Sequence, residues 1–142
     1  MRRKRNHRPI QELDFVKEHT SLSEVLQNKA LSKLGDSYVN FVYSLAKSIK
    51  DKELINERVP SRILAEALKR ANLRKYLPNR ISRHDQGDAA EALIGYGWSQ
   101  GLVSLEECVH ILAQRGDDPI EAFVSLIKST MGRLEVTDWQ RK

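Results

Sequence analysis

Apolar residues recur every three or four positions along most of the chain, which is the period of an amphipathic helix. The longest pattern predicts a helix over residues 29–50, with one apolar face formed by Leu31, Leu34, Tyr38, Val42, Leu45, Ala46 and Ile49. Residues 51–59 are charged and irregular, and they predict a connection. A second pattern predicts a helix over 60–72, because Pro60 suits a first helical turn, where its missing N–H has no partner.

Capping and turn residues divide the rest of the chain into further helices. Ser21 and Ser104 each begin a capping box, in which a glutamate follows three residues later. A helix over 84–99 is expected to end near Gly101, which is suited to a C-terminal cap. Asp118 and the proline after it predict the start of a helix that runs to about residue 133. No useful alternating strand pattern is present, so the predicted fold class is all-α, with six or seven helices.

Length and composition favour one globular domain. The chain has 142 residues, of which 40% are hydrophobic and 30% charged. No apolar run approaches the roughly 18 residues of a membrane span, and no secretory signal is expected. Cys108 is the single cysteine, which excludes an internal disulfide and a multi-cysteine zinc site. We therefore expect a cytoplasmic protein without a membrane partner.

The net charge of +5 is concentrated at the N-terminus. Residues 1–9 contain no acid and five cationic side chains, namely Arg2, Arg3, Lys4, Arg5 and Arg8. Removing these five from the 24 Lys and Arg residues leaves 19, which equals the number of Asp and Glu residues. The sequence thus predicts a basic arm over 1–9 and a neutral helical domain over 10–142. The arm is interpreted as a nucleic-acid contact, with a solvated tail as the alternative.

Two acidic clusters on predicted helices are candidates for chemistry. Asp36 follows a glycine inside the longest helix, beside its apolar face. Asp88 and Glu91 lie one turn apart on another helix, only about 60° apart around its axis, where they repel each other unless a cation lies between them. Small residues surround this pair, so we expect the second helix to pack closely on another one, for example at Gly35. Three carboxylates brought together in this way would suit Mg²⁺ or Mn²⁺, whereas surface acids are the alternative.

The segments LSKLGDSYVNFVYSLA (31–46) and DQGDAAEALIGYGW (85–98) together resemble the two motifs of the ribonuclease III endonuclease domain. Their order, their helical setting and the roughly fifty residues between them all match that family. The resemblance covers about residues 21–135. It is nearest to the short Mini-III and archaeal forms, because the chain has no room for a separate double-stranded-RNA-binding domain.

The resemblance implies a ribonuclease III-type fold and a Mg²⁺- or Mn²⁺-dependent endoribonuclease that cuts double-stranded or structured RNA as a homodimer. It assigns metal binding and catalysis to Asp36, Asp88 and Glu91, with a metal-activated water as the nucleophile. Apolar residues beyond one stripe of the long helix, such as Val39 and Phe41, allow a partner contact as well as a core contact.

One position departs from the standard family motif. Ser32 stands where the family usually has an acid one turn before the aspartate. Ser32 and Asp85 are candidates for residues that support the metal ligands without binding the metal themselves, Ser32 by holding a metal-bound water. Lys29 and Lys33 are candidates for phosphate contact. Because the acid is missing, a non-catalytic RNA-binding or ribosome-associated protein that retains the fold is the alternative function.

Overall fold

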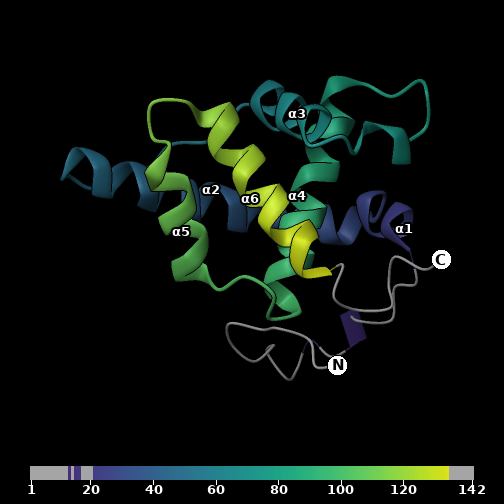
Figure 1. Ribbon diagram of the computed structural model, residues 1–142, viewed down its shortest axis with the longest axis horizontal. Coiled ribbons are helices and arrows are strands. Elements are labelled where there is room, and N and C mark those ends of the chain that lie inside the picture. The colour runs from purple at the N-terminus through teal and green to yellow at the C-terminus, as the bar shows by residue number, and fades with distance from the viewer. Residues whose placement is uncertain (1–12, 14, 17–20, 135–142) are drawn as a thin grey trace.

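The structure is a computed structural model in which residue 13, residues 15–16 and residues 21–134 are described. This part of the chain contains α-helices, short 3₁₀ segments and no strand, so the predicted all-α class is confirmed. The main elements are α1 (Leu22–Leu26), α2 (Lys29–Asp51), α3 (Ser61–Arg70), η2 (Arg74–Tyr76), α4 (Arg83–Ser99), α5 (Leu105–Gln114) and α6 (Pro119–Leu134) (Figure 1). None of these helices is both long and apolar enough to cross a membrane.

The predicted caps form at three helix starts. The hydroxyl of Ser21 accepts from the Glu24 N–H at 3.1 Å, and the hydroxyl of Ser104 accepts from the Glu107 N–H at 3.1 Å. Asp118 caps α6 in the same way. Each cap satisfies a backbone donor that the first helical turn leaves without a partner.

Two details of the boundaries differ from the predictions. Pro60 is the N-cap of α3 rather than a first-turn residue, so the helix begins one position later than expected. The helix predicted from the Ser21 cap is only five residues long, because Asn28 caps α2 separately through a bond from the Leu31 N–H. The end of α4 follows the prediction, since Gly101 takes the left-handed conformation with φ 74° directly after the last turn.

Helix α4 runs through the middle of the molecule and contacts α1, α2, α3 and α6 (Figure 1). Its middle and C-terminal turns are buried on every side, including residues 89–97 without a break. Most of these residues are alanine or glycine, so neighbouring helices can approach it closely. A helix that is apolar all round belongs in the centre of a core.

The closest approach joins α4 to α2 at two glycines, as the sequence predicts. A Cβ atom added to Gly35 would lie 2.0 Å from the backbone oxygen of Glu91. A Cβ added to Gly95 would lie 3.2 Å from the Cα of Gly35. Only hydrogen fits at Gly35, so the two helix backbones are in contact directly beside Asp36 and at Glu91 itself.

Candidate active site

A cavity of about 320 Å³ opens where α2 and α4 meet the segment that leads into α3. Most of the predicted site residues line it: Asp36, Asp88 and Glu91 with Lys29, Ser32 and Lys33. Asp85 lines an adjoining hollow of about 130 Å³ instead. The arm residues Arg2, Arg3, Lys4, Arg5 and Arg8 lie outside the described residues. The structure therefore brings together two acidic clusters that are about fifty positions apart in the sequence.

Glu91 is the most buried of the three acids, with 7% of the residue exposed. Burial raises the pKa of Glu91 to about 8, and a hydrogen bond with Asp36 and the negative charges of Asp36 and Asp88 act in the same direction. The positive charge of Arg58 lowers the pKa but does not offset these effects. At neutral pH the carboxyl group of Glu91 thus holds a proton, and a cation placed among the three acids would take over the role of that proton.

Asp36 is fixed from two directions. The guanidinium of Arg58 donates from Nη2 to Asp36 Oδ1 at 3.0 Å and to Oδ2 at 3.3 Å. The side-chain amide of Asn40, one turn along α2, donates to Asp36 Oδ1 at 2.9 Å and to the Asp36 carbonyl at 2.7 Å. The carboxylate therefore keeps one orientation at the mouth of the cavity.

Asp88 faces a different pair of partners. The ammonium of Lys29 lies 3.7 Å from Asp88 Oδ2 and 3.6 Å from Asp85 Oδ1, so one lysine bridges two acids of α4. The imidazole of His84 lies 3.6 Å from the same oxygen of Asp88. In this arrangement Lys29, which the sequence suggested as a phosphate contact, is engaged with Asp85 and Asp88. Lys33 is exposed on the next turn of α2 and also lines the cavity.

Ser32 is buried, with 6% of the residue exposed, and it lines both the main cavity and the adjoining hollow. Its hydroxyl therefore lies where the standard family motif has an acid. A hydroxyl carries no charge, so this position adds a polar group to the site without increasing the repulsion among Asp36, Asp88 and Glu91.

The donor set fits a divalent metal by its chemistry, although the carboxylates do not yet form a ligand cluster. Within residues 21–134, no three His, Cys, Asp or Glu side chains converge closely enough to hold an ion as they stand. Asp36 and Asp88 each contact a basic side chain instead, Arg58 and Lys29 respectively. Burial first, and then the neighbouring Asp36 and Asp88, raise the pKa of Glu91, so a cation in this cavity would meet three acids. Hard oxygen donors of this kind are the ligands that Mg²⁺ and Mn²⁺ prefer.

The residues that sequence reasoning missed belong to the connection between α2 and α3. We call residues 55–59 the strap, because this segment runs back along α2. Ser48 and Ser44 bind the backbone of Ile55 and Glu57 through their hydroxyls, and Asn40 accepts from the Val59 N–H at 2.7 Å. In the sequence, the polar residues at 40, 44 and 48 form a visible row at helical spacing, but nothing there identifies their partner.

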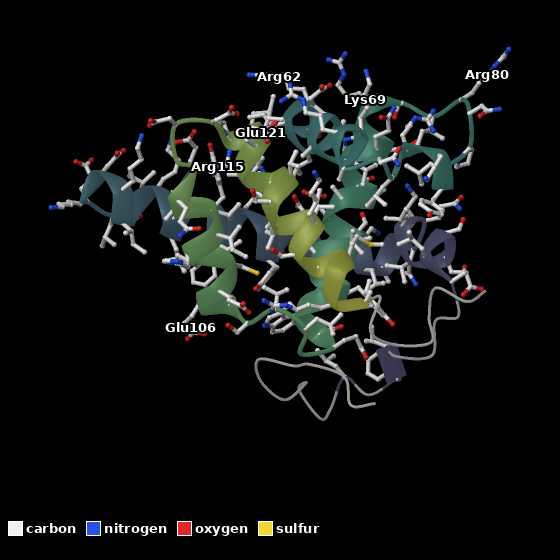
Figure 2. The ribbon with its side chains drawn as sticks, viewed as in Figure 1. Arg62, Lys69, Arg80, Glu106, Arg115 and Glu121 are labelled. Atoms are coloured by element: carbon white, nitrogen blue, oxygen red, sulfur yellow. The ribbon has the colours of Figure 1, made fainter. Side chains whose placement is uncertain are left out.

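A second hollow of about 450 Å³ lies between α3 and the start of α4, and it is strongly basic. Its lining includes Arg62, Lys69, Arg70 and Arg83 against the single acid Glu66. Arg70 is engaged by Glu66 and Glu121 at 3.0 and 2.9 Å. Figure 2 shows Arg62 and Lys69 projecting outward along one edge of the molecule.

The comparisons with known proteins agree with this geometry. The family model described as Ribonuclease III matches residues 29–135, which is about three quarters of the chain and includes both acidic clusters. The chain belongs to the ribonuclease III family. No curated protein matches it significantly. The resemblance drawn from the two motifs is thereby confirmed, and the cavity lies where both motifs of this ribonuclease III domain meet.

Proposed function

We propose that this protein is a metal-dependent endoribonuclease that hydrolyses phosphodiester bonds in double-stranded or structured RNA. The observation that carries the proposal is the common cavity of Asp36, Asp88 and Glu91 in a chain of the ribonuclease III family. Membership of the family supports a nuclease-type hydrolase that acts on RNA. With its single cysteine reduced, the protein is expected to act in the cytoplasm.

The three carboxylates would hold one or two Mg²⁺ or Mn²⁺ ions. When bound, the metal supplies Lewis-acid chemistry, which activates water and offsets charge on the leaving oxygen. To hold such a cation, Glu91 would have to give up its proton, because proton and cation would neutralise the same buried charge. Asn40 keeps the Asp36 carboxylate oriented, and Ser32 offers a hydroxyl to water beside the ligands.

RNA would be held mainly through its phosphates and its shape. Lys33, Lys29 and Arg58 line the cavity that contains the acids. The basic hollow with Arg62 and Lys69 lies between α3 and the start of α4. Together with the N-terminal arm, these side chains would neutralise the backbone of a duplex without reading its sequence. Aromatic residues are only 6% of the chain, which argues against recognition by base stacking.

We also propose a homodimer that forms through α2. Leu34, Phe41 and Ile49 are 44%, 54% and 61% exposed, and their spacing of seven and eight places them on one side of the helix. Val39, which the sequence offered as a further partner contact, is fully buried in the core. The apolar stripe that remains outside the core is therefore narrower than the sequence suggests, and it is centred on Phe41.

The alternative function is RNA binding without cleavage. The neutral Ser32 and the engagement of Asp36 and Asp88 with basic side chains favour it. The two functions differ in one respect only, since both require the basic surface but cleavage also requires the three acids.

Incubation with a generic RNA duplex tests the proposal directly. We expect cleavage with Mg²⁺ or Mn²⁺ and none with EDTA, as seen on a denaturing gel. Asp88→Asn should abolish cleavage and leave RNA binding largely intact, whereas Asp51→Asn, at the exposed end of α2, is the matched control and should cleave normally. Intact RNA in every metal condition, together with tight binding, would favour the non-catalytic alternative.

A further inference from the structure

The strap and α2 fit each other by their repeat distances. Four residues along a helix rise about 6.0 Å, and two residues of extended chain span about 6.6 Å. Asn40, Ser44 and Ser48 follow one another at four-residue spacing, and they bind Val59, Glu57 and Ile55 at two-residue spacing in the opposite direction. Successive polar side chains on this face of α2 thus bind the backbone of alternate strap residues, one residue each.

This register determines where Arg58 lies. Arg58 lies between Glu57 and Val59, whose backbones are bound at positions 44 and 40 of α2. Its long side chain extends one turn further along the same row and places its guanidinium on the Asp36 carboxylate. Asn40 connects Asp36 to the strap directly, because its side chain donates to Asp36 and accepts from the Val59 N–H. The strap is held through its backbone, so the side chain of Arg58 is not needed to keep it in place.

The ion pair between Arg58 and Asp36 has the properties of an exchangeable contact. The two side chains are 73% and 40% exposed, and exposed ion pairs contribute little to folding. Arg58 also lines the cavity that contains Asp36, Asp88 and Glu91, where its positive charge acts on the buried Glu91. A cation in this position competes with any other cation that the acids would bind.

We propose that Arg58 is the built-in counterion of the metal site: it holds Asp36 while no metal is bound, is displaced when a divalent cation binds, and then contacts a phosphate of the RNA. This inference rests on the proposed function and adds a positioning residue to it. Since the strap remains attached to α2, the displaced guanidinium stays beside the cavity mouth. A guanidinium is well suited to this exchange, because its fork of N–H donors fits a carboxylate and a phosphate equally.

Replacement of Arg58 by glutamine separates these two effects. In Arg58→Gln, Mn²⁺ should bind about three- to tenfold more tightly in calorimetry without RNA, because an exposed ion pair and one nearby positive charge are lost. RNA affinity, measured in Ca²⁺ with the RNA checked for cleavage, should fall, and its dependence on salt should flatten by about 0.9 in the log–log slope. Lys47→Gln is the matched control, since Lys47 lies 3.6 Å from Glu57 on the same strap but does not line the cavity.

The strap itself is tested by Ser44→Ala, which removes the two bonds to Glu57 without touching a carboxylate. Because the loosened strap would place Arg58 less firmly on Asp36, Ser44→Ala should also tighten Mn²⁺ binding, but less than Arg58→Gln does. It should have no further effect on Mn²⁺ affinity when Arg58 is already glutamine. An additive effect in the double variant would refute positioning by the strap.

Three outcomes of the Arg58→Gln experiment would overturn the proposal. Mn²⁺ affinity that changes no more than in Lys47→Gln would show that Arg58 does not compete with metal. Weaker binding of both metal and RNA would show a purely structural role. Absence of Mn²⁺ binding in every variant, including the unaltered protein, would overturn the metal-dependent function as well, whereas the first two outcomes leave that function intact.

Discussion

The contact between α2 and α4 at Gly35 makes a quantitative prediction. In Gly35→Ala the new methyl group would lie 2.0 Å from the Glu91 oxygen and 2.6 Å from its carbonyl carbon. Atoms of the backbone cannot rotate away, so the two helices must separate by about 1 Å at this point. Overpacking of this kind costs about 1–3 kcal/mol, and the better helix propensity of alanine returns at most about 1 kcal/mol.

We therefore expect Gly35→Ala to lower the free energy of unfolding by about 1–2 kcal/mol, which corresponds to a fall in Tm of roughly 3–7 °C for a protein of this size. Urea unfolding, with the slope m compared between variants, measures the change. Gly132→Ala is the control, because in the described part of the chain nothing besides its neighbouring residues and the backbone of its own helix lies within 4 Å of the position where its Cβ would lie. That variant should gain about 0.5–1 kcal/mol. Equal stability of the two variants would refute the close approach of α2 and α4.

Three further predictions concern charge and assembly. In the metal-free protein, the pKa of Glu91 is about 8 in the folded state and lies above the ordinary value of 4.5, so the free energy of unfolding should fall as pH rises from about 4.5 to 8. Glu91→Gln should remove this decrease, and an unchanged pH profile would contradict the burial argument. Light scattering should give about twice 16.3 kDa, and Phe41→Glu should give a monomer. Leu54→Glu, at an even more exposed position in the connection after α2, should not. Deletion of residues 1–8 should flatten the salt dependence of duplex binding by about 3–4 units if three to five arm residues contact phosphate, and an unchanged slope would identify the arm as a solvated tail.

Most of the fold follows from local signals in the sequence. Ser21, Ser104 and Asp118 cap helices because a short polar side chain satisfies the first-turn donors whatever the tertiary structure is. The meeting of Gly35 with α4 was also predictable, since a row of small residues needs a close neighbour. These features depend on the sequence within a few positions or on side-chain size alone.

The rest of the site depends on contacts between distant segments. In the sequence, Arg58 is one of several charged residues in an irregular connection. Only the attachment of the strap to α2 brings its guanidinium within reach of Asp36. Likewise, Lys29 precedes Asp36 by nearly two turns, yet it extends across to Asp85 and Asp88 of another helix. The direction of a long flexible side chain is set by the charges around it in space, which periodicity does not report.

The burial of α4 on every side affects how this site can be redesigned. Asp88 and Glu91 lie on a helix whose neighbours are fitted to alanine and glycine; at Gly97, for example, an added Cβ would lie 2.6 Å from Thr130 Cγ2. Libraries that vary α4 would therefore return mostly unfolded proteins. Variation at Lys33 and Arg58 reaches the same cavity from α2 and the strap, through exposed side chains that are not part of the packing between helices. An effort to alter metal preference or substrate range would start from those two side chains.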